Sequence, residues 1–220
     1  MADTTLKVDA LQPHDCYKLL TAIIVPRPIA FVSTLSDAGL VNAAPYSFFN
    51  MFAEAPPTIV LGLSWRPDTS LKDTTANIRR SGEFVVNLVD EELAQAMSDA
   101  AIDFPPGVSE TAALGIEMAP SVEIEPPRIK AAPFALECRK TVGLSFSESR
   151  EILVGEIIAI HARDGLLDPE RLHVNMLKYH PVGRLHGNLY ARQRDIFELK
   201  RPSYADWVEA STNARLPEKK

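Results

Sequence analysis

Residues 42–49 read NAAPYSFF and residues 64–78 read SWRPDTSLKDTTANI. The first stretch offers small side chains, backbone amides and aromatic faces, which suit a flat ring. The second stretch offers cations, hydroxyls and an amide near an expected helix start, where anions bind well. A ligand that joins a flat polar ring to a phosphate would suit both stretches.

The chain has 220 residues, which is enough for one well-buried domain. Hydrophobic residues make up 46% and charged residues 24%, an ordinary globular composition. The net charge of −6 comes without a basic block or an aromatic-interleaved basic stripe, which argues against a nucleic-acid partner. The N-terminus lacks the features of a signal peptide, and prolines break the best apolar run, residues 23–32. We therefore expect a soluble, cytoplasmic protein without a membrane span.

Several kinds of chemistry have no support in the sequence. Cys16 and Cys138 are far apart, so we expect two buried free thiols rather than a disulfide scaffold or a zinc site. The histidines lack the His-Glu-x-x-His spacing of a metal site. The glycine patterns of hydrolase elbows, Rossmann folds and P-loops are also missing.

The first half of the chain predicts strands joined by tight turns. Residues 29–35 and 40–46 are expected to form a hairpin, with Gly39 at a turn position of positive φ. Residues 58–64 are predicted to form a third strand, set off by the proline pair that begins at Pro56.

A helix is predicted next, because Ser70 and Asp73 have the spacing of a capping box. It should cover residues 71–80 and stop at the Ser-Gly pair that follows. A strand over residues 83–89 and a helix over residues 90–101 complete this half.

The proline-rich residues 104–133 predict an irregular excursion with a short helix near residues 110–114. It could be a binding lid or a surface loop that covers a barrel edge. Two long strands follow at residues 134–144 and 152–162. The remaining expected elements are a loop with a short helix over residues 166–177 and a strand over residues 181–190.

Six or seven strands joined mostly by turns, with few helices, favour a mainly β fold built as a closed β-barrel. We expect an N-terminal extension over residues 1–15 and one domain over residues 16–199. Residues 200–220 form a polar tail that we expect to be loosely packed.

In their order and spacing, residues 42–49 and 64–78 resemble the FMN-binding split-barrel proteins of the flavin reductase-like family. This group includes flavoredoxin and the reductase components of two-component monooxygenases. Residues 26–34 and 181–190 also resemble the family, and the resemblance covers residues 16–199. The excursion matches no pattern of the family, and there the selectivity for a pyridine nucleotide or a partner would be set.

The resemblance implies a set of FMN-binding residues. Those expected at the flavin ring are Asn42, Ala44, Ser47 and Phe48, with Thr34 nearby. Those expected at the ribityl phosphate are Ser64, Arg66, Lys72, Thr74 and Asn77. Two further candidates, from the segment that closes the family's cofactor pocket, are Arg184 and Tyr190. A strand end would explain Thr34 equally well, and a surface Arg and a half-buried Tyr would explain the last two almost as well.

The resemblance implies an FMN-dependent oxidoreductase, most simply an NAD(P)H:flavin reductase that supplies a partner monooxygenase. Hydride from NADH or NADPH would pass directly to flavin N5, so the protein needs no catalytic acid, base, nucleophile or metal. Two alternatives stay open: a flavin-binding electron carrier that does not oxidise pyridine nucleotides, and an interaction domain without a cofactor. The intact segment 72–74 argues against the second alternative.

We also expect a homodimer. The family places its flavin at a subunit interface, and apolar residues dominate both faces of the strand at residues 152–162.

Overall fold

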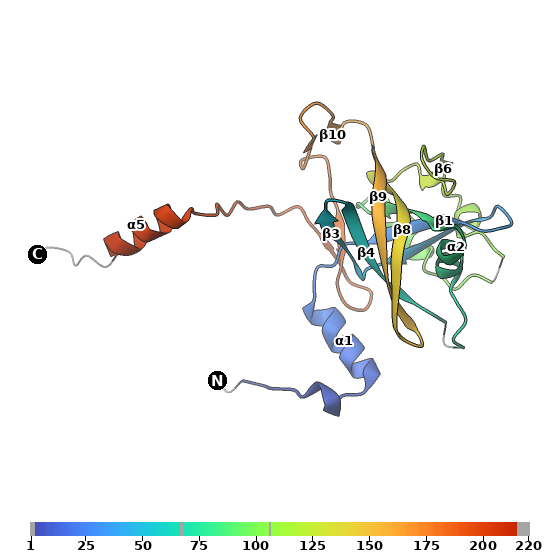
Figure 1. The fold of residues 1–220 in the computed structure, drawn as a ribbon, viewed down its shortest axis with the longest axis horizontal. Coiled ribbons are helices and arrows are strands. Elements are labelled where there is room, and N and C mark those ends of the chain that lie inside the picture. The colour runs from blue at the N-terminus through green and yellow to red at the C-terminus, as the bar shows by residue number, and fades with distance from the viewer. Residues whose placement is uncertain (1–2, 67, 106, 215–220) are drawn as a thin grey trace, which may run out of the picture.

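The computed structural model describes residues 3–66, 68–105 and 107–214, and a seven-stranded antiparallel sheet forms its centre (Figure 1). The strands follow the order β2-β1-β5-β8-β9-β4-β3 across the sheet. Their bounds are β1 (Ala30–Leu35), β2 (Val41–Tyr46), β3 (Phe49–Glu54), β4 (Pro57–Ser64), β5 (Glu83–Leu88), β8 (Phe134–Ser147) and β9 (Arg150–Ala162). The mainly β class and the predicted hairpin of β1 and β2 are confirmed, and Gly39 in its turn has a φ of +75°.

The sheet rolls up because its two edge strands are consecutive in the chain. Only Ser47 and Phe48 separate β2 from β3. The backbone N–H of Gly62 on β4 donates to the Phe48 carbonyl at 2.6 Å, which holds this connection against β4.

The predicted closed barrel is wrong, because no ladder joins β2 to β3 in the described part of the chain. Successive antiparallel pairings give β2 and β3 the same direction. The chain therefore continues from one edge strand into the other instead of reversing, so the two cannot form a hairpin.

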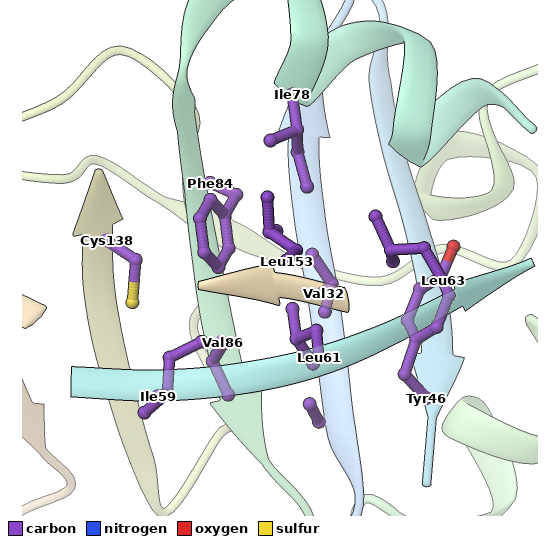
Figure 2. Packing of buried hydrophobic residues seen from close by; sticks show 11 residues of the cluster. Val32, Tyr46, Ile59, Leu61, Leu63, Ile78, Phe84, Val86, Cys138 and Leu153 are labelled. Atoms are coloured by element: carbon purple, nitrogen blue, oxygen red, sulfur yellow. The ribbon is translucent and has the colours of Figure 1, made fainter. Parts of the chain in front are cut away.

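The main core lies inside the rolled sheet. Figure 2 shows β4 running across the strands that carry Val32, Tyr46 and Val86, with apolar side chains between them. Alternate residues of β4 point inward, as a half-buried strand requires, and Leu61 is fully buried. Ile78 adds a side chain from helix α2 (Asp73–Ser81).

A second core cluster lies on the outer face of β1, around Phe31. It is covered by α3 (Ala94–Asp99) and by the excursion, which contains α4 (Glu110–Ala113), β6 (Met118–Ala119) and β7 (Arg128–Ile129). The Asn87 side chain anchors the excursion by accepting from the Ile129 N–H at 2.8 Å. This part of the excursion therefore covers the sheet, which was one of the two predicted alternatives.

The predicted capping box of α2 is wrong. The helix begins at Asp73, two residues later than predicted, and Lys72 precedes it without a side-chain cap. Ser70 Oγ instead donates to Asp68, and Asp73 pairs with Arg66. The predicted stop is confirmed, because Gly82 adopts a left-handed conformation with φ +75°.

The other predicted helices also differ from the structure. Only residues 94–99 of the predicted helix 90–101 are helical. Asp90 forms a β-bridge with Pro181, and the Glu91 N–H donates to the His180 carbonyl at 3.1 Å, so the start of the predicted helix is extended. Residues 166–177 form no helix but a small hairpin of β10 (Leu167–Asp168) and β11 (His173–Val174). There the Asp168 carboxylate accepts from the N–H groups of two turn residues.

The ends of the chain carry elements that the sequence did not predict. Residues 181–190 form a hairpin of β12 (Val182–Arg184) and β13 (Tyr190–Arg192) rather than one strand. The N-terminal segment contains a 3-10 helix η1 (Val8–Ala10) and α1 (Pro13–Ile23), which leaves Cys16 half-buried, not buried. In the tail, α5 (Tyr204–Ala214) extends away from the sheet (Figure 1). None of the helices described combines the length and apolar character needed to cross a membrane.

The close contact between β9 and the core predicts that Gly155→Ala will destabilise the fold. A Cβ at Gly155 would lie 2.6 Å from Cζ of Phe84, which is fully buried. We expect a loss of about 1–3 kcal/mol in the free energy of unfolding, the usual cost of overpacking a core. Chemical denaturation measures it, with exposed Ser145→Val on β8 as a control that should shift stability by less than about 0.5 kcal/mol. Equal stability of both variants would show that the core has spare room at this position.

Candidate functional site

A cavity of about 740 Å³ opens where β2, β4 and the start of α2 meet. Residues 100–104 and Glu110 form another part of its wall, and Phe104 and Glu110 of this group belong to the excursion, so one end of the excursion reaches the site. The other predicted alternative was that the excursion takes part in binding. The position of these residues in the cavity wall is consistent with that alternative.

The cavity brings together most of the residues predicted to bind FMN. Those that line it are Asn42, Ala44, Ser47, Phe48, Ser64, Arg66, Lys72 and Thr74. Thr34 and Asn77 are buried and belong to a hydrogen-bond network next to the cavity. Arg184 and Tyr190 are not among the lining residues. Their assignment to the cofactor pocket stays a prediction.

One end of the cavity is cationic. The Arg66 guanidinium bonds to the Asp73 carboxylate at 3.0 Å and to the Leu71 carbonyl, so its charge is partly compensated. Lys72 and Arg150 have no carboxylate partner among the described residues. The N–H groups in the first turn of α2 also lack acceptors within the helix. An anion would find charge and hydrogen-bond donors together here.

Arg150 is a site residue that the sequence analysis missed. It begins β9 and pairs in register with Ser64, which places it across from the predicted phosphate segment. In the sequence it belongs to a polar turn, where an arginine is usually a solvated surface residue. Only the pairing of β9 with β4 brings it to the cavity.

The other end of the cavity is apolar and tightly built. Gly62 allows Phe48 to lie against β4, because a Cβ on Gly62 would stand 2.8 Å from the Phe48 Cβ. Tyr17 of α1 lies next to Phe48, with ring centroids 6.3 Å apart, and also lines the cavity. This end can accept the apolar face of a ring. The Tyr46 hydroxyl lies toward the other end, near Thr74 and Asp73, and burial raises its pKa to about 12, so it stays protonated and neutral.

A chain of buried polar side chains runs next to the cavity. The Asn42 side chain donates to Glu110 at 2.7 Å and accepts from the Thr74 hydroxyl at 2.8 Å. It also accepts from Thr34 at 3.3 Å, and Thr34 in turn accepts from Asn77 at 3.0 Å. The hydroxyl proton of Thr74 is therefore already used within the protein. Burial raises the pKa of the Glu110 carboxyl above its usual range.

Arg27 is a buried residue that organises one side of the site. Its guanidinium donates to the carbonyls of Thr21, Ile24 and Leu185, each at 2.7 Å, and more weakly to Ser47 Oγ at 3.4 Å. These bonds tie the end of α1 and the β12–β13 hairpin to the connection between β2 and β3. A second, mostly apolar cavity of about 550 Å³ lies here, and its wall also includes Phe48.

The β12–β13 hairpin holds the two predicted residues that do not line the main cavity. The Arg184 guanidinium bonds to the Tyr190 hydroxyl and lies 4.6 Å from the centre of its ring. The Arg184 and Tyr190 side chains thus contact each other within the hairpin. No group of three or more His, Cys, Asp or Glu side chains in the described ranges could hold a metal ion.

The sequence and the fold match known proteins over most of the chain. The model of the flavin reductase like domain matches residues 23–183. The crystal structure of Pseudomonas fluorescens 2-nitrobenzoate 2-nitroreductase is 40% identical, covers 91% of this chain and 98% of its own, and superposes with a TM-score of 0.85.

Two further structures support the same assignment. Nitrilotriacetate monooxygenase component B from Bacillus cereus is 32% identical, with coverage of 90% and 100% and a TM-score of 0.85. A Shewanella frigidimarina protein described as a putative flavin reductase with a split barrel domain is 15% identical, with coverage of 89% and 96% and a TM-score of 0.76, and supports the fold alone. The rolled, open sheet is thus a split barrel, and this chain belongs to the flavin reductase-like family.

Proposed function

We propose that this protein is an FMN-dependent NAD(P)H:flavin reductase of the cytoplasm, with a functional domain over residues 16–199. The observation that carries the proposal is a single cavity with a ring-sized apolar end and a cationic end at the start of α2. The unpaired cations Lys72 and Arg150 suit a phosphate, and the small side chains of Ala44 and Ser47 leave space for a flat ring. The residues present therefore fit FMN.

The chemistry that the cofactor supplies when bound is hydride acceptance at N5 from NADH or NADPH. The protein's own residues bind and orient. Lys72 and the α2 N–H groups would hold the phosphate, while Phe48 and Tyr17 would provide an apolar wall for the ring. No proton donor or acceptor is required from the protein, because the rate depends on the approach of the two rings.

The relatives suggest where the electrons go. The 32% identical structure is a monooxygenase component, which favours delivery of reduced flavin to a partner monooxygenase. The 40% identical structure is a nitroreductase that acts on 2-nitrobenzoate, so direct reduction of a nitroaromatic acid is the second candidate. An FMN-binding electron carrier that does not oxidise NAD(P)H is a third candidate, and turnover measurements separate all three.

FMN should bind more tightly than riboflavin, and Lys72→Ala should remove much of the difference. We expect a loss of about 1.5–3 kcal/mol in FMN affinity, the range for a hydrogen bond to a charged group. Isothermal titration with both flavins measures it. Lys130→Ala is the matched control, because Lys130 is exposed and paired with Glu117 far along the excursion. Equal affinity of wild type for both flavins would place the phosphate elsewhere.

Oxidation of NADH or NADPH should require flavin and should depend on the ring wall more than on histidine. Ser47→Trp should abolish anaerobic single-turnover flavin reduction, because its indole would fill the ring space. His180→Ala and His186→Ala should change the rate by less than about tenfold, below the effect of losing a general acid or base. Absence of NAD(P)H oxidation with FMN, FAD and riboflavin would favour the electron carrier. Faster oxidation with added 2-nitrobenzoate would favour the nitroreductase.

The protein should be a homodimer in solution. α1 and β3 expose large apolar side chains next to the site, with Ile23 62%, Met51 70% and Phe52 73% exposed, and β9 leaves Ile160 63% exposed. An isologous contact would bury such faces on both copies. Sedimentation at micromolar concentration should give twice the chain mass with flavin bound. A flavin-loaded particle of one chain mass would contradict the dimer.

A further inference from the structure

We propose that Glu110 is a positioning residue that sets the spacing between the ring end and the phosphate end of the flavin cavity. This inference rests on the proposed function. Glu110 lies in the excursion, and its side chain is buried although it is ionisable. A buried carboxylate persists only where it is well hydrogen-bonded.

Both oxygens of Glu110 hold β2. Oε1 accepts from the Asn42 side chain at 2.7 Å, and Oε2 accepts from the Ala43 backbone N–H at 3.2 Å. The two donors come one and two residues before Ala44, which lines the ring end of the cavity. The carboxylate therefore fixes the strand on which the ring would lie.

The same carboxylate determines how β2 connects to α2. A carboxylate only accepts hydrogen bonds, so the amide nitrogen of Asn42 must face Glu110 and its oxygen must face the other way. That oxygen accepts from Thr74 in the first turn of α2 and from Thr34, which accepts from Asn77 of the same helix. Glu110 thus orients Asn42, a side chain that joins the ring strand β2 to the phosphate helix α2.

This connection matters only for a ligand that touches both ends. FMN would contact β2 with its ring and the start of α2 with its phosphate, so its affinity depends on the spacing of the two. Riboflavin has no phosphate and depends on the ring end alone. A ligand that binds at two linked points gains affinity from the second point only if the spacing of the two sites fits it. The ratio of the riboflavin Kd to the FMN Kd therefore measures how well the spacing fits FMN.

The excursion does not depend on Glu110 to stay in place. Ser109, the residue that caps α4, donates to the Val41 carbonyl at 2.5 Å and accepts from the Ala112 N–H at 3.3 Å. Replacing Glu110 should therefore break the network and leave α4 on β2.

The experiment compares riboflavin and FMN affinities by isothermal titration in the wild type and in four variants. Glu110→Ala should lower the Kd ratio by about tenfold, as expected for a lost hydrogen bond to a charged group, and change the riboflavin Kd by less than about threefold. Glu110→Gln should lower the ratio less than Glu110→Ala does, because its single amide oxygen can still accept from one of the two β2 donors, the Asn42 side chain or the Ala43 N–H. Glu117→Ala, on the exposed part of the excursion, is the control and should leave the ratio unchanged.

Thr34→Val, the fourth variant, breaks the same network at its far end with a side chain of the same shape. It should lower the ratio in the same direction, and it decides the question if Glu110→Ala does not fold. An unchanged ratio in folded Glu110→Ala or in Thr34→Val would overturn the inference. An equal loss of affinity for FMN and riboflavin would also overturn it, because that result would indicate a general loosening of the site and not a change in spacing. A wild type that binds neither flavin would instead overturn the proposed function and this inference together.

Discussion

The connection of two residues between β2 and β3 is the constraint on which the rest of the structure depends. Three Cα–Cα steps separate Tyr46 from Phe49, so those residues lie no more than about 11 Å apart. Yet β2 and β3 stand at opposite edges of a seven-stranded sheet. The sheet must therefore roll until its edges nearly meet. The seam that results has backbone from Ser47 and Phe48 on one side and β4 on the other, and both cavities open along it.

A seam of this kind explains why polar groups are buried beside it. Strand edges leave N–H and C=O groups without ladder partners, and the side chains around them must supply hydrogen bonds. At one side of the seam, Arg27 donates to carbonyls at the end of α1 and in the turn of the β12–β13 hairpin. At the other side, the Glu110 carboxylate accepts from Asn42 and from the Ala43 N–H. The cavity is thus lined by groups whose orientation is already determined before any ligand binds, which lowers the cost of binding.

The sequence predicted the strands and the anion-binding segment because both depend on local patterns. An apolar stretch set off by a proline pair predicted β4, and a glycine expected at a positive φ predicted the turn between β1 and β2. The capping box failed because the same Ser-x-x-Asp spacing also allows other partners. Arg66 pairs with Asp73, and Asp68 binds Ser70. The partners that Ser70 and Asp73 bind depend on the tertiary structure, which their spacing in the sequence does not determine.

The residues of the candidate site also divide into those that a local sequence pattern predicts and those that only the tertiary structure brings to the cavity. Those on β2 and at the start of α2 were predictable, since one continuous segment supplies each group. Arg150 and Tyr17 were not, because they come from a turn and a helix that only the rolled sheet brings to the cavity. Thr34 and Asn77 were predicted as ligand contacts, but they have each other as hydrogen-bond partners. A short polar side chain near a site can serve the ligand or the framework, and the sequence alone does not distinguish the two.

The excursion shows how one segment can serve both the fold and the site. Its far part is bound to the sheet by buried groups: Ser33 Oγ donates to the Pro127 carbonyl at 2.6 Å, and Glu137 accepts from two backbone N–H groups of the excursion at 2.7 and 2.8 Å. Glu137 is fully buried and also bonds to His161, so releasing this part would remove two of the hydrogen bonds that stabilise a buried carboxylate. Such a segment is a fixed cover, not a lid that opens for each substrate. Any selectivity that it confers must therefore act through its two residues that line the cavity, Phe104 and Glu110.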